Sequence, residues 1–247
     1  MRRYFTVFDP RPVGVGSLAI PVSRSREPRP AADQPFLRCH AIAPLVALVV
    51  VAVSIGVVVT TSLVAASGDV PDWESSALEF VNGWPDALEP LLWVLQQAGL
   101  LVAPIAVGLV IVALTRRWQY LIPFVLVLPL KLGIEKGIVK QLVERERPFV
   151  SVGSDVIVRG TAFEGLSFPS GHVTTAFATA TLVSAFLPPR WRPLPILWAV
   201  VVAVSRLYFG EHNLLDVVAG AGMGIAFATV LWVGILNRLA ETGDASR

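Results

Sequence analysis

Two of the chain's three histidines, His172 and His212, stand among residues that suit them to phosphoryl transfer. Asp216 follows His212 by four residues, so on a helix the two side chains lie on one face, one turn apart. An aspartate there can hold the imidazole in one tautomer and stabilise the cation formed when the other ring nitrogen attacks phosphorus. His172 can then protonate the leaving alkoxide and later activate water. The spacing predicts His212 as nucleophile, Asp216 as its orienting partner and His172 as the acid/base.

Cationic residues near these histidines could surround one multiply charged anion. They are Lys140, Arg147 and Arg206. Guanidinium groups match phosphate oxygens in pairs, and lysine adds a point charge. The run Pro-Ser-Gly-His at 169–172 predicts a helix start, where free backbone N–H groups and the helix dipole favour an anion. These features predict a phosphate cradle that needs no metal or other cofactor, formed by Lys140, Arg147, Ser170, Gly171 and Arg206.

Each of these signals is ordinary when it stands alone. A single histidine at a membrane interface is usually structural, a single arginine at a helix end usually anchors topology, and Ser-Gly is usually a turn. The prediction therefore depends on their combination. Among the nearby charges, Lys131 and Glu135 are one turn apart and are expected to pair, whereas Lys136 is left open.

The rest of the chain is apolar enough to require a membrane. Of its 247 residues, 54% are hydrophobic and 15% are charged, whereas soluble domains carry about 25% charged residues. The mean hydropathy is +0.67. We expect an all-α, polytopic membrane protein, because helices satisfy their own backbone hydrogen bonds in lipid. Six segments have the length to span a bilayer: 41–66, 90–114, 118–141, 171–187, 194–210 and 217–237.

The charges between the spans predict their orientation. Arginines gather in four segments that we expect in the cytoplasm: 1–40, 114–119, 188–193 and 238–247. The 67–89 segment has no Lys or Arg and six acidic residues, as an outside loop has. Both termini are then cytoplasmic, and every candidate catalytic residue falls at the outer face. We expect a disordered basic tail over 1–40, a six-helix membrane domain over 41–237 and a short tail over 238–247.

The outside segment has a helical pattern of its own. Apolar residues recur at helical spacing between acidic ones over 71–89, at positions 73, 77, 80, 81, 84 and 88. This pattern predicts an amphipathic helix in the outer membrane interface. It could be a packing cap, which we favour, or a gate for a lipid chain.

Taken in order, the site residues resemble the three-part signature of the type 2 phosphatidic acid phosphatase superfamily. The signature is complete: Lys140-x6-Arg147-Pro148, then Pro169-Ser170-Gly171-His172, then Ser205-Arg206-x5-His212-x3-Asp216. The resemblance covers about 41–237 and implies a six-helix core shared with vanadium-dependent haloperoxidases. It also implies metal-independent hydrolysis through a phosphohistidine, with His212 as nucleophile, Asp216 as its partner and His172 as acid/base. The other matching positions are implied to bind phosphate.

The predicted function is a lipid phosphate phosphatase of the cell membrane with an extracytoplasmic site. Candidate substrates are an isoprenoid diphosphate, phosphatidylglycerophosphate and phosphatidate, the first being favoured because an outer site suits recycling of a carrier lipid. The alternatives are a phosphotransferase with an acceptor other than water and a non-catalytic transporter or scaffold. The expected partners are the lipid substrate and the bilayer, with no nucleic acid, and the sequence leaves the oligomeric state open. The loop 149–168 is expected to set specificity.

Overall fold

The computed structural model describes residues 37–159 and 165–245. Nearly all of the predicted basic tail, and positions 160–164 of the loop 149–168, lie outside the described residues. Within the described ranges the chain forms helices and no strand, as an all-α protein should.

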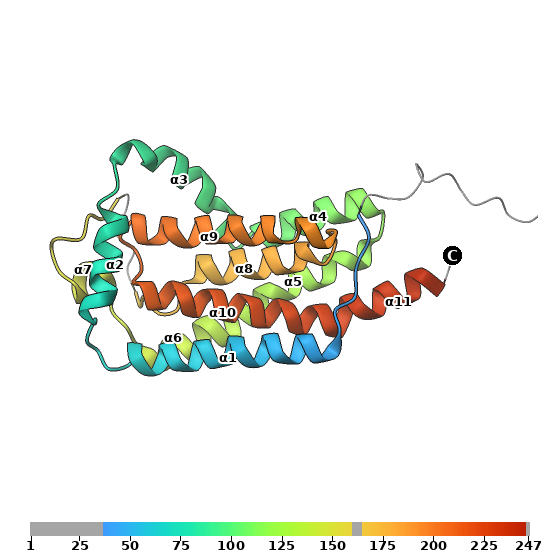
Figure 1. The fold of residues 1–247 in the computed structure, drawn as a ribbon, viewed down its shortest axis with the longest axis horizontal. Coiled ribbons are helices and arrows are strands. Elements are labelled where there is room, and N and C mark those ends of the chain that lie inside the picture. The colour runs from blue at the N-terminus through green and yellow to red at the C-terminus, as the bar shows by residue number, and fades with distance from the viewer. Residues whose placement is uncertain (1–36, 160–164, 246–247) are drawn as a thin grey trace, which may run out of the picture. The chain divides into compact units, whose positions relative to one another are not determined.

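The helices form a bundle with α8 at its centre. Its members are α1 (Pro44–Ala65), α4 (Ala103–Thr115), α5 (Leu121–Leu130), α8 (Gly171–Ser184), α9 (Pro193–Tyr208) and α10 (Leu214–Leu231). Helix α8 packs against α10, α9, α4 and α5 and is buried along almost its whole length (Figure 1). Three of its threonines, at 174, 175 and 179, are satisfied there because their hydroxyls donate to carbonyls one turn back, as Thr179 does to Thr175 at 2.8 Å.

Glycines on α10 let this helix approach both of its neighbours. A Cβ at Gly220 would lie 2.6 Å from the carbonyl oxygen of Ser170, and one at Gly222 would lie 3.1 Å from that of Ser54 on α1. Small residues are typical of such close helix contacts in membranes. Gly220 therefore lets the start of α8, with its Ser-Gly-His sequence, lie close to the helix that carries Asp216.

Two helices are long and apolar enough to cross a bilayer: Pro44–Ala65 and Leu214–Glu241, which continues α10 through η7 (Trp232–Leu236) into α11 (Asn237–Ala245). A third is added if Asp86–Gly99 and Ala103–Thr115, which meet at a 72° bend, form one span. Helices α8 and α9 have 14 and 16 residues, too few alone for a hydrocarbon core of about 30 Å at about 1.5 Å per residue. Within the described residues, two to three helices are therefore candidate spans by length and composition, and six spans remain a prediction.

The segment 90–114 is not the single straight helix that its apolar run predicts. It divides into α3 (Glu89–Leu95), the 3-10 turn η3 (Gln96–Gly99) and α4. The chain is extended at Leu100, and Pro104 sits at the start of α4. A Cβ at Gly99 would lie 2.8 Å from Cβ of His172. The break brings η3 directly against the N-terminal end of α8, a contact that composition alone does not reveal.

A wide helical turn follows α5. After Pro129, which lacks a backbone N–H, the chain forms a π-helix, η5 (Lys131–Val139), and then the short α6 (Lys140–Val143). π-Helical turns change which side chains face a neighbour and are common at functional sites. Lys131, Glu135 and Lys140 all come from this region. Helix α7 (Pro148–Ser151) follows.

Helix α2 (Asp72–Asn82) lies across one end of the bundle, near the C-terminus of α9 and the N-terminus of α10 (Figure 1). It is shorter than the predicted 71–89 segment, because a turn and η2 (Asp86–Leu88) separate it from α3. Its buried face is also different from the predicted apolar face. Glu74, Leu78 and Asn82 are buried, whereas Trp73 and Phe80 are 55% and 72% exposed. The two aromatic side chains thus point away from the protein.

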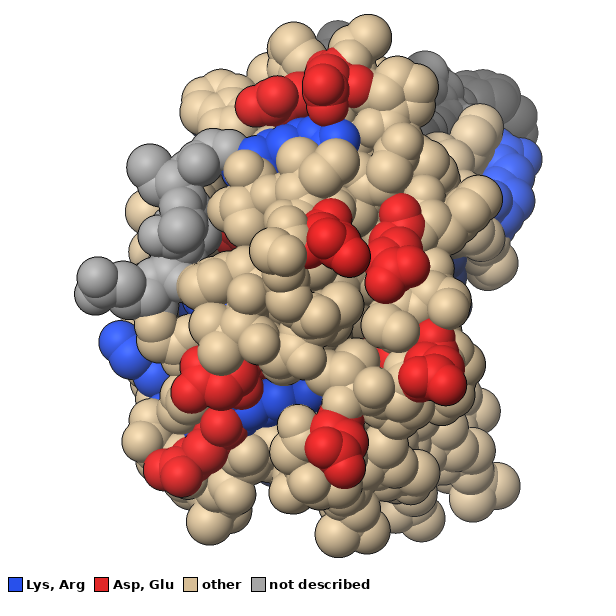
Figure 2. All heavy atoms as spheres, turned by 90° about the vertical axis from the view of Figure 1, so that its left-hand side faces the viewer, with Lys and Arg blue, Asp and Glu red and all other residues tan. Residues whose placement is uncertain are grey.

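Acidic side chains dominate the surface at this end of the bundle. Figure 2 views it face-on, with acidic groups spread over it and Lys or Arg visible in few places. The exposed acids of the segments that gather here are Asp69, Asp72, Glu79, Asp86, Glu144, Glu146 and Asp155.

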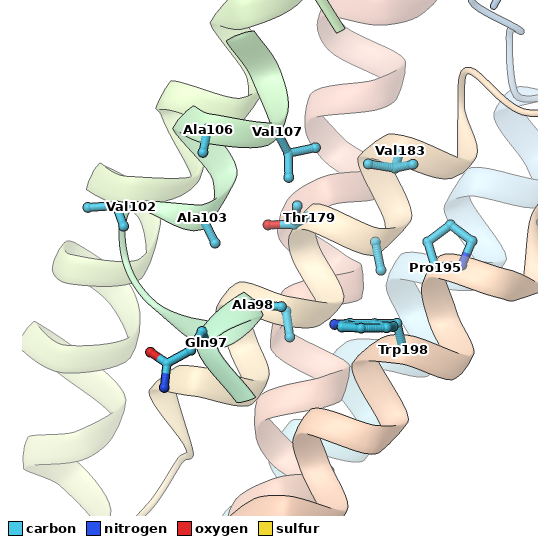
Figure 3. A pocket seen from close by; sticks show the side chains of 12 residues that line it. Gln97, Ala98, Val102, Ala103, Ala106, Val107, Thr179, Val183, Pro195 and Trp198 are labelled. Carbon is cyan, nitrogen blue, oxygen red and sulfur yellow. The ribbon is translucent and has the colours of Figure 1, made fainter. Parts of the chain in front are cut away.

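An apolar groove of about 480 Å³ runs between α4, α8 and α9 (Figure 3). Its wall includes Ala103 and Ala106 from α4, Thr179 and Val183 from α8, and Trp198 from α9. Small side chains on the facing helices leave this space open. Two further 3-10 turns, η4 (Trp118–Tyr120) and η6 (Pro189–Trp191), lie in connections at the other end of the helices.

Candidate active site

Six of the eight predicted site residues line one cavity of about 420 Å³ at the α2 end of the bundle. They are Lys140, Arg147, Gly171, His172, Arg206 and His212. Its wall also includes Lys131, Glu135, Lys136 and Glu211. Both histidines and all three predicted cations therefore face the same space, although they come from four separate stretches of the chain.

The remaining two residues, Ser170 and Asp216, lie behind the cavity wall. Both are fully buried. The backbone N–H of Ser170 donates to the carbonyl oxygen of Asp216 at 2.9 Å, and its hydroxyl has no hydrogen-bond partner within the described part of the chain. The structure thus places Ser170 beside the site but not on its wall.

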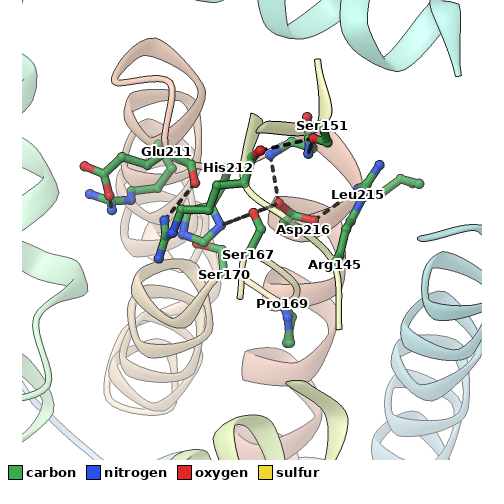
Figure 4. Close-up of polar contacts among 12 residues, drawn as sticks. Arg145, Ser151, Ser167, Pro169, Ser170, Glu211, His212, Leu215 and Asp216 are labelled. Atoms are coloured by element: carbon green, nitrogen blue, oxygen red, sulfur yellow. Dashed lines mark hydrogen bonds and ion pairs between the residues drawn. The ribbon is translucent and has the colours of Figure 1, made fainter. Parts of the chain in front are cut away.

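Asp216 lies in the first turn of α10, where its carboxylate is held on several sides (Figure 4). Its Oδ2 accepts the Asn213 backbone N–H at 2.8 Å and the Ser167 hydroxyl. The same oxygen lies 3.6 Å from Nδ1 of His212, and the Ser167 hydroxyl is 3.4 Å from that nitrogen. The Nδ1 side of the ring therefore faces the carboxylate, which leaves Nε2 for the cavity that the ring lines.

His212 lies in the loop between α9 and α10, and its surroundings favour the neutral ring. Burial lowers the pKa of His212 to about 4, because the charged imidazole would lose its hydration, and the nearby Asp216 carboxylate offsets only part of this effect. The positive charges of Arg206 and Arg147 lower the pKa further. A neutral ring keeps a lone pair near neutral pH, as a nucleophile must.

A buried ion network lies behind Asp216. Arg145 Nη1 donates to Asp216 Oδ1 at 3.1 Å, and the same guanidinium holds Glu74 of α2 through two bonds of 2.9 and 2.6 Å. Glu74 Oε1 also accepts the backbone N–H of Leu215 at 2.7 Å. Burial alone would lower the pKa of Arg145, but the hydrogen bonds with Glu74 and the charge of Asp216 outweigh it and raise that pKa.

Three residues of this arrangement were missed by the sequence reasoning: Ser167, Glu74 and Arg145. Glu74 counted only as part of the polar face of an amphipathic helix, and Ser167 resembles any turn serine. Arg145 offered one weak signal, because it precedes Arg147 by two residues in a charged run. A pair separated by 71 positions, such as Arg145 and Glu74, leaves no trace in local spacing.

The predicted cations are held by neighbouring oxygen atoms. Arg206 donates to the side-chain oxygen of Gln96 and pairs with Glu211. Arg147 donates to the carbonyl oxygens of Glu211, at 2.9 Å, and Gly165, at 3.1 Å. Lys140 donates to the carbonyl oxygen of Pro169 at 3.4 Å. Donors that are held before an anion arrives need little reorganisation when it binds.

The predicted pairing of Lys131 with Glu135 is confirmed, with Nζ 3.6 Å from Oε2. Lys131 also stands at the cavity, since a Cβ at Gly171 would lie 2.9 Å from its Nζ. Glycine at 171 thus leaves room for a cation beside the start of α8. Lys136 is exposed and also on the wall. Among the described residues, no three His, Cys, Asp or Glu side chains are grouped as metal ligands would be.

A second, smaller cavity of about 320 Å³ lies beside the charged cavity and borders the apolar groove at Gln97. It shares His172, Arg206 and Glu211 with the charged cavity. It shares Gln97 with the groove. The wall between the reactive end of α8 and the groove is therefore formed by η3, the turn that breaks the predicted second span.

The fold and this site define a class of protein. Residues 109–240 match the PAP2 superfamily, which is more than half of the chain, and the chain therefore belongs to that superfamily. The type 2 phosphatidic acid phosphatase assignment made from the signature is confirmed.

Individual relatives support the same family. An undecaprenyl-diphosphatase of Sulfolobus acidocaldarius is 34% identical over 150 residues, 58% of this chain and 66% of that protein. The chain spans between about one third and two thirds of the length of the first curated relatives it matches.

Two crystal structures share the fold. The PAP2-type phosphatidylglycerolphosphate phosphatase of Bacillus subtilis gives a TM-score of 0.53 at 21% identity, covering 78% of this chain and 96% of that one. Aquifex aeolicus LpxE gives 0.57 at 23% identity, covering 66% and 96%. The apolar helices Pro44–Ala65 and Leu214–Glu241 have the length and composition of membrane spans.

Proposed function

We propose that this protein is a lipid phosphate phosphatase that works through a phosphohistidine on His212. The observation that carries the proposal is the shared cavity, in which two histidines and three held cations meet. Lys140, Arg147 and Arg206 would surround the phosphate oxygens and stabilise the charge of the in-line transition state.

The geometry supports a two-step reaction. Nε2 of His212 attacks phosphorus, and His172 gives its proton to the departing alkoxide or phosphate. His172 then takes a proton from water, and the resulting hydroxide displaces phosphate from His212. Asp216 holds the ring and stabilises its positive charge in the phosphorylated state.

The apolar groove supports a lipid as substrate. The cavity beside η3 borders both the site and this groove, so a substrate with its phosphate at His212 could place a hydrocarbon chain between α4, α8 and α9. The groove's volume of about 480 Å³ falls within the range of about 300–1,000 Å³ usual for ligand pockets. Among the candidates, an isoprenoid diphosphate remains the first choice, ahead of phosphatidylglycerophosphate and phosphatidate.

We also propose six membrane crossings with the site outside and both termini in the cytoplasm. The α5–α6 segment is not apolar along its whole length, because it carries Lys131, Glu135, Lys136 and Lys140. These four charged residues lie together at the end of the segment nearest the site. The acidic surface around the site (Figure 2) supports an outside position, because Lys and Arg are the residues retained in the cytoplasm. Trp73 and Phe80, which point away from the protein, would then lie in the outer interface.

The proposal is tested by assaying the purified protein in detergent against a panel of lipid monophosphates and diphosphates. We expect free phosphate to be released, EDTA to leave the rate unchanged, and vanadate to inhibit by resembling pentacoordinate phosphorus. Phosphate appearing on an added alcohol instead of in solution would favour the phosphotransferase alternative. A complete absence of turnover with every lipid, by folded protein, would refute the proposal.

A further inference from the structure

Glu74 and Arg145 are buried charges that the proposed reaction does not use directly. Neither lines the cavity, so neither touches the substrate. Their exposures are 0% and 4%. Burying an ion pair usually costs as much as the pairing returns, so such a pair is weak evidence for stability alone. Its place in the structure calls for another reason.

The contacts of Asp216 supply that reason. Its two carboxylate oxygens have different partners: Oδ2 serves Ser167, His212 and the start of α10, whereas Oδ1 is bound by Arg145. Rotation of the carboxylate would exchange the two oxygens and break this division. Arg145 opposes that rotation only if its own guanidinium is fixed, and Glu74 fixes it through two parallel bonds.

We propose that Glu74 and Arg145 are positioning residues of the phosphatase: Glu74 fixes Arg145, and Arg145 locks the Asp216 carboxylate in the orientation that holds His212. This inference rests on the proposed function. It assigns α2 a role in catalysis, although no residue of that helix lies on the cavity wall.

Glu74 has a second attachment that strengthens the brace. Its bond from the Leu215 N–H satisfies a donor in the first turn of α10, where backbone N–H groups lack partners within the helix. The same carboxylate thus fixes both Arg145 and the start of the helix that carries Asp216. Opening α2 as a gate would break all of these buried bonds, so the structure favours a brace over a gate.

The test compares Glu74→Gln with Glu79→Gln, the same change on the exposed side of the same helix. Glutamine at 74 keeps the size but replaces one acceptor with an N–H₂ group that faces the guanidinium. We expect kcat to fall about 10- to 100-fold, by analogy with the loss of a group that orients a metal ligand. KM and inhibition by inorganic phosphate should stay within about twofold, because the cavity cations are untouched. Glu79→Gln should match the wild type.

A merely structural role is separated by combining the change with Asp216→Asn. If Glu74 acts through Asp216, Glu74→Gln should have little further effect on kcat in that background, because residues that act as a unit are not additive. An undiminished 10- to 100-fold loss there would overturn the proposal. Arg145→Lys provides a second variant should Glu74→Gln fail to fold: it keeps the charge, loses the two-point contact and should reproduce the fall in kcat.

The positioning role of Glu74 and Arg145 and the phosphatase activity can be refuted separately. If the wild type hydrolyses a lipid phosphate and depends on His212, but Glu74→Gln and Arg145→Lys both behave as Glu79→Gln does, the brace is wrong and the phosphatase stands. If the folded wild type hydrolyses no lipid phosphate, both are refuted.

Discussion

Two hollows beside α8 differ in almost every physical property. Towards its N-terminus, His172 faces a cavity with five cationic side chains on the wall: Lys131, Lys136, Lys140, Arg147 and Arg206. Further along, Thr179 and Val183 face a groove in which Gln97 is the other polar residue besides the threonine. One helix thus borders a cationic cavity at its end and an apolar groove along its side.

Under the proposed function, this difference assigns headgroup chemistry and chain recognition to separate surfaces. Charge and hydrogen bonds in the cavity can select a phosphate but not a chain. The groove can accommodate a chain but contributes nothing to bond cleavage. Changes in the cavity should therefore alter the rate with every substrate, and changes in the groove should alter the ranking of substrates.

The largest effect is expected from His212→Ala. Loss of a catalytic nucleophile costs about a million-fold in comparable hydrolases, and no labelled phosphoenzyme should form from a ³²P-labelled lipid. The control is His40→Ala, the third histidine, which lies before α1 and outside the cavity. Substantial turnover by His212→Ala would show that the charged cavity is not the catalytic site.

A smaller fall in kcat is expected from Arg206→Lys. Lysine keeps the charge but cannot contact two phosphate oxygens as a guanidinium does, and removal of one transition-state donor costs about 100- to 1,000-fold in kcat. The loss should be equal, within a factor of about two, for long-chain and short-chain substrates, measured as kcat/KM. A loss confined to one chain length would contradict the separation of the two surfaces.

The pH dependence of phosphoenzyme formation tests whether burial in the cavity lowers the pKa of His212. With the pKa of His212 lowered to about 4, the nucleophile stays neutral as the pH falls through 6 and 5, whereas an ordinary histidine, with a pKa of about 6.5, would be about nine-tenths protonated at pH 5.5. Single-turnover formation of the phosphoenzyme should therefore stay level down to about pH 5 and decline only as the pH approaches about 4. A midpoint near pH 6.5 would show that burial does not lower the pKa of His212.

The smallest effect is expected in the groove. Ala106→Trp fills it, whereas Ala113→Trp places the same side chain on the exposed surface of α4 outside it. A displaced chain moves into lipid that is equally apolar, so it loses packing and not hydrophobic energy. We expect kcat/KM for a long-chain substrate to fall about tenfold through misplacement of the phosphate, with a short-chain analogue unaffected. Equal effects of both variants on both substrates would show that the groove does not hold the chain.

Sequence reasoning performed best where residue type limits the possible explanations. Charged side chains are costly in an apolar chain, so the cations and histidines stood out, and six of the eight chosen residues line one cavity. It performed poorly where the local pattern was ambiguous. The prediction placed the apolar side chains of α2 on its buried face. In the structure the buried face carries Glu74, and the aromatic side chains of Trp73 and Phe80 point away from the protein.

The sequence by itself determined the family, and it predicted the membrane class and the residues of the candidate site, since these follow from composition and from a fixed order of reactive residue types. Only the tertiary structure decided that 90–114 breaks beside His172 and that Ser167 joins the carboxylate of Asp216. It alone brought Glu74 to Arg145. The physical reason is that such contacts join positions far apart in the chain, and the helix packing that brings them together follows from no local periodicity.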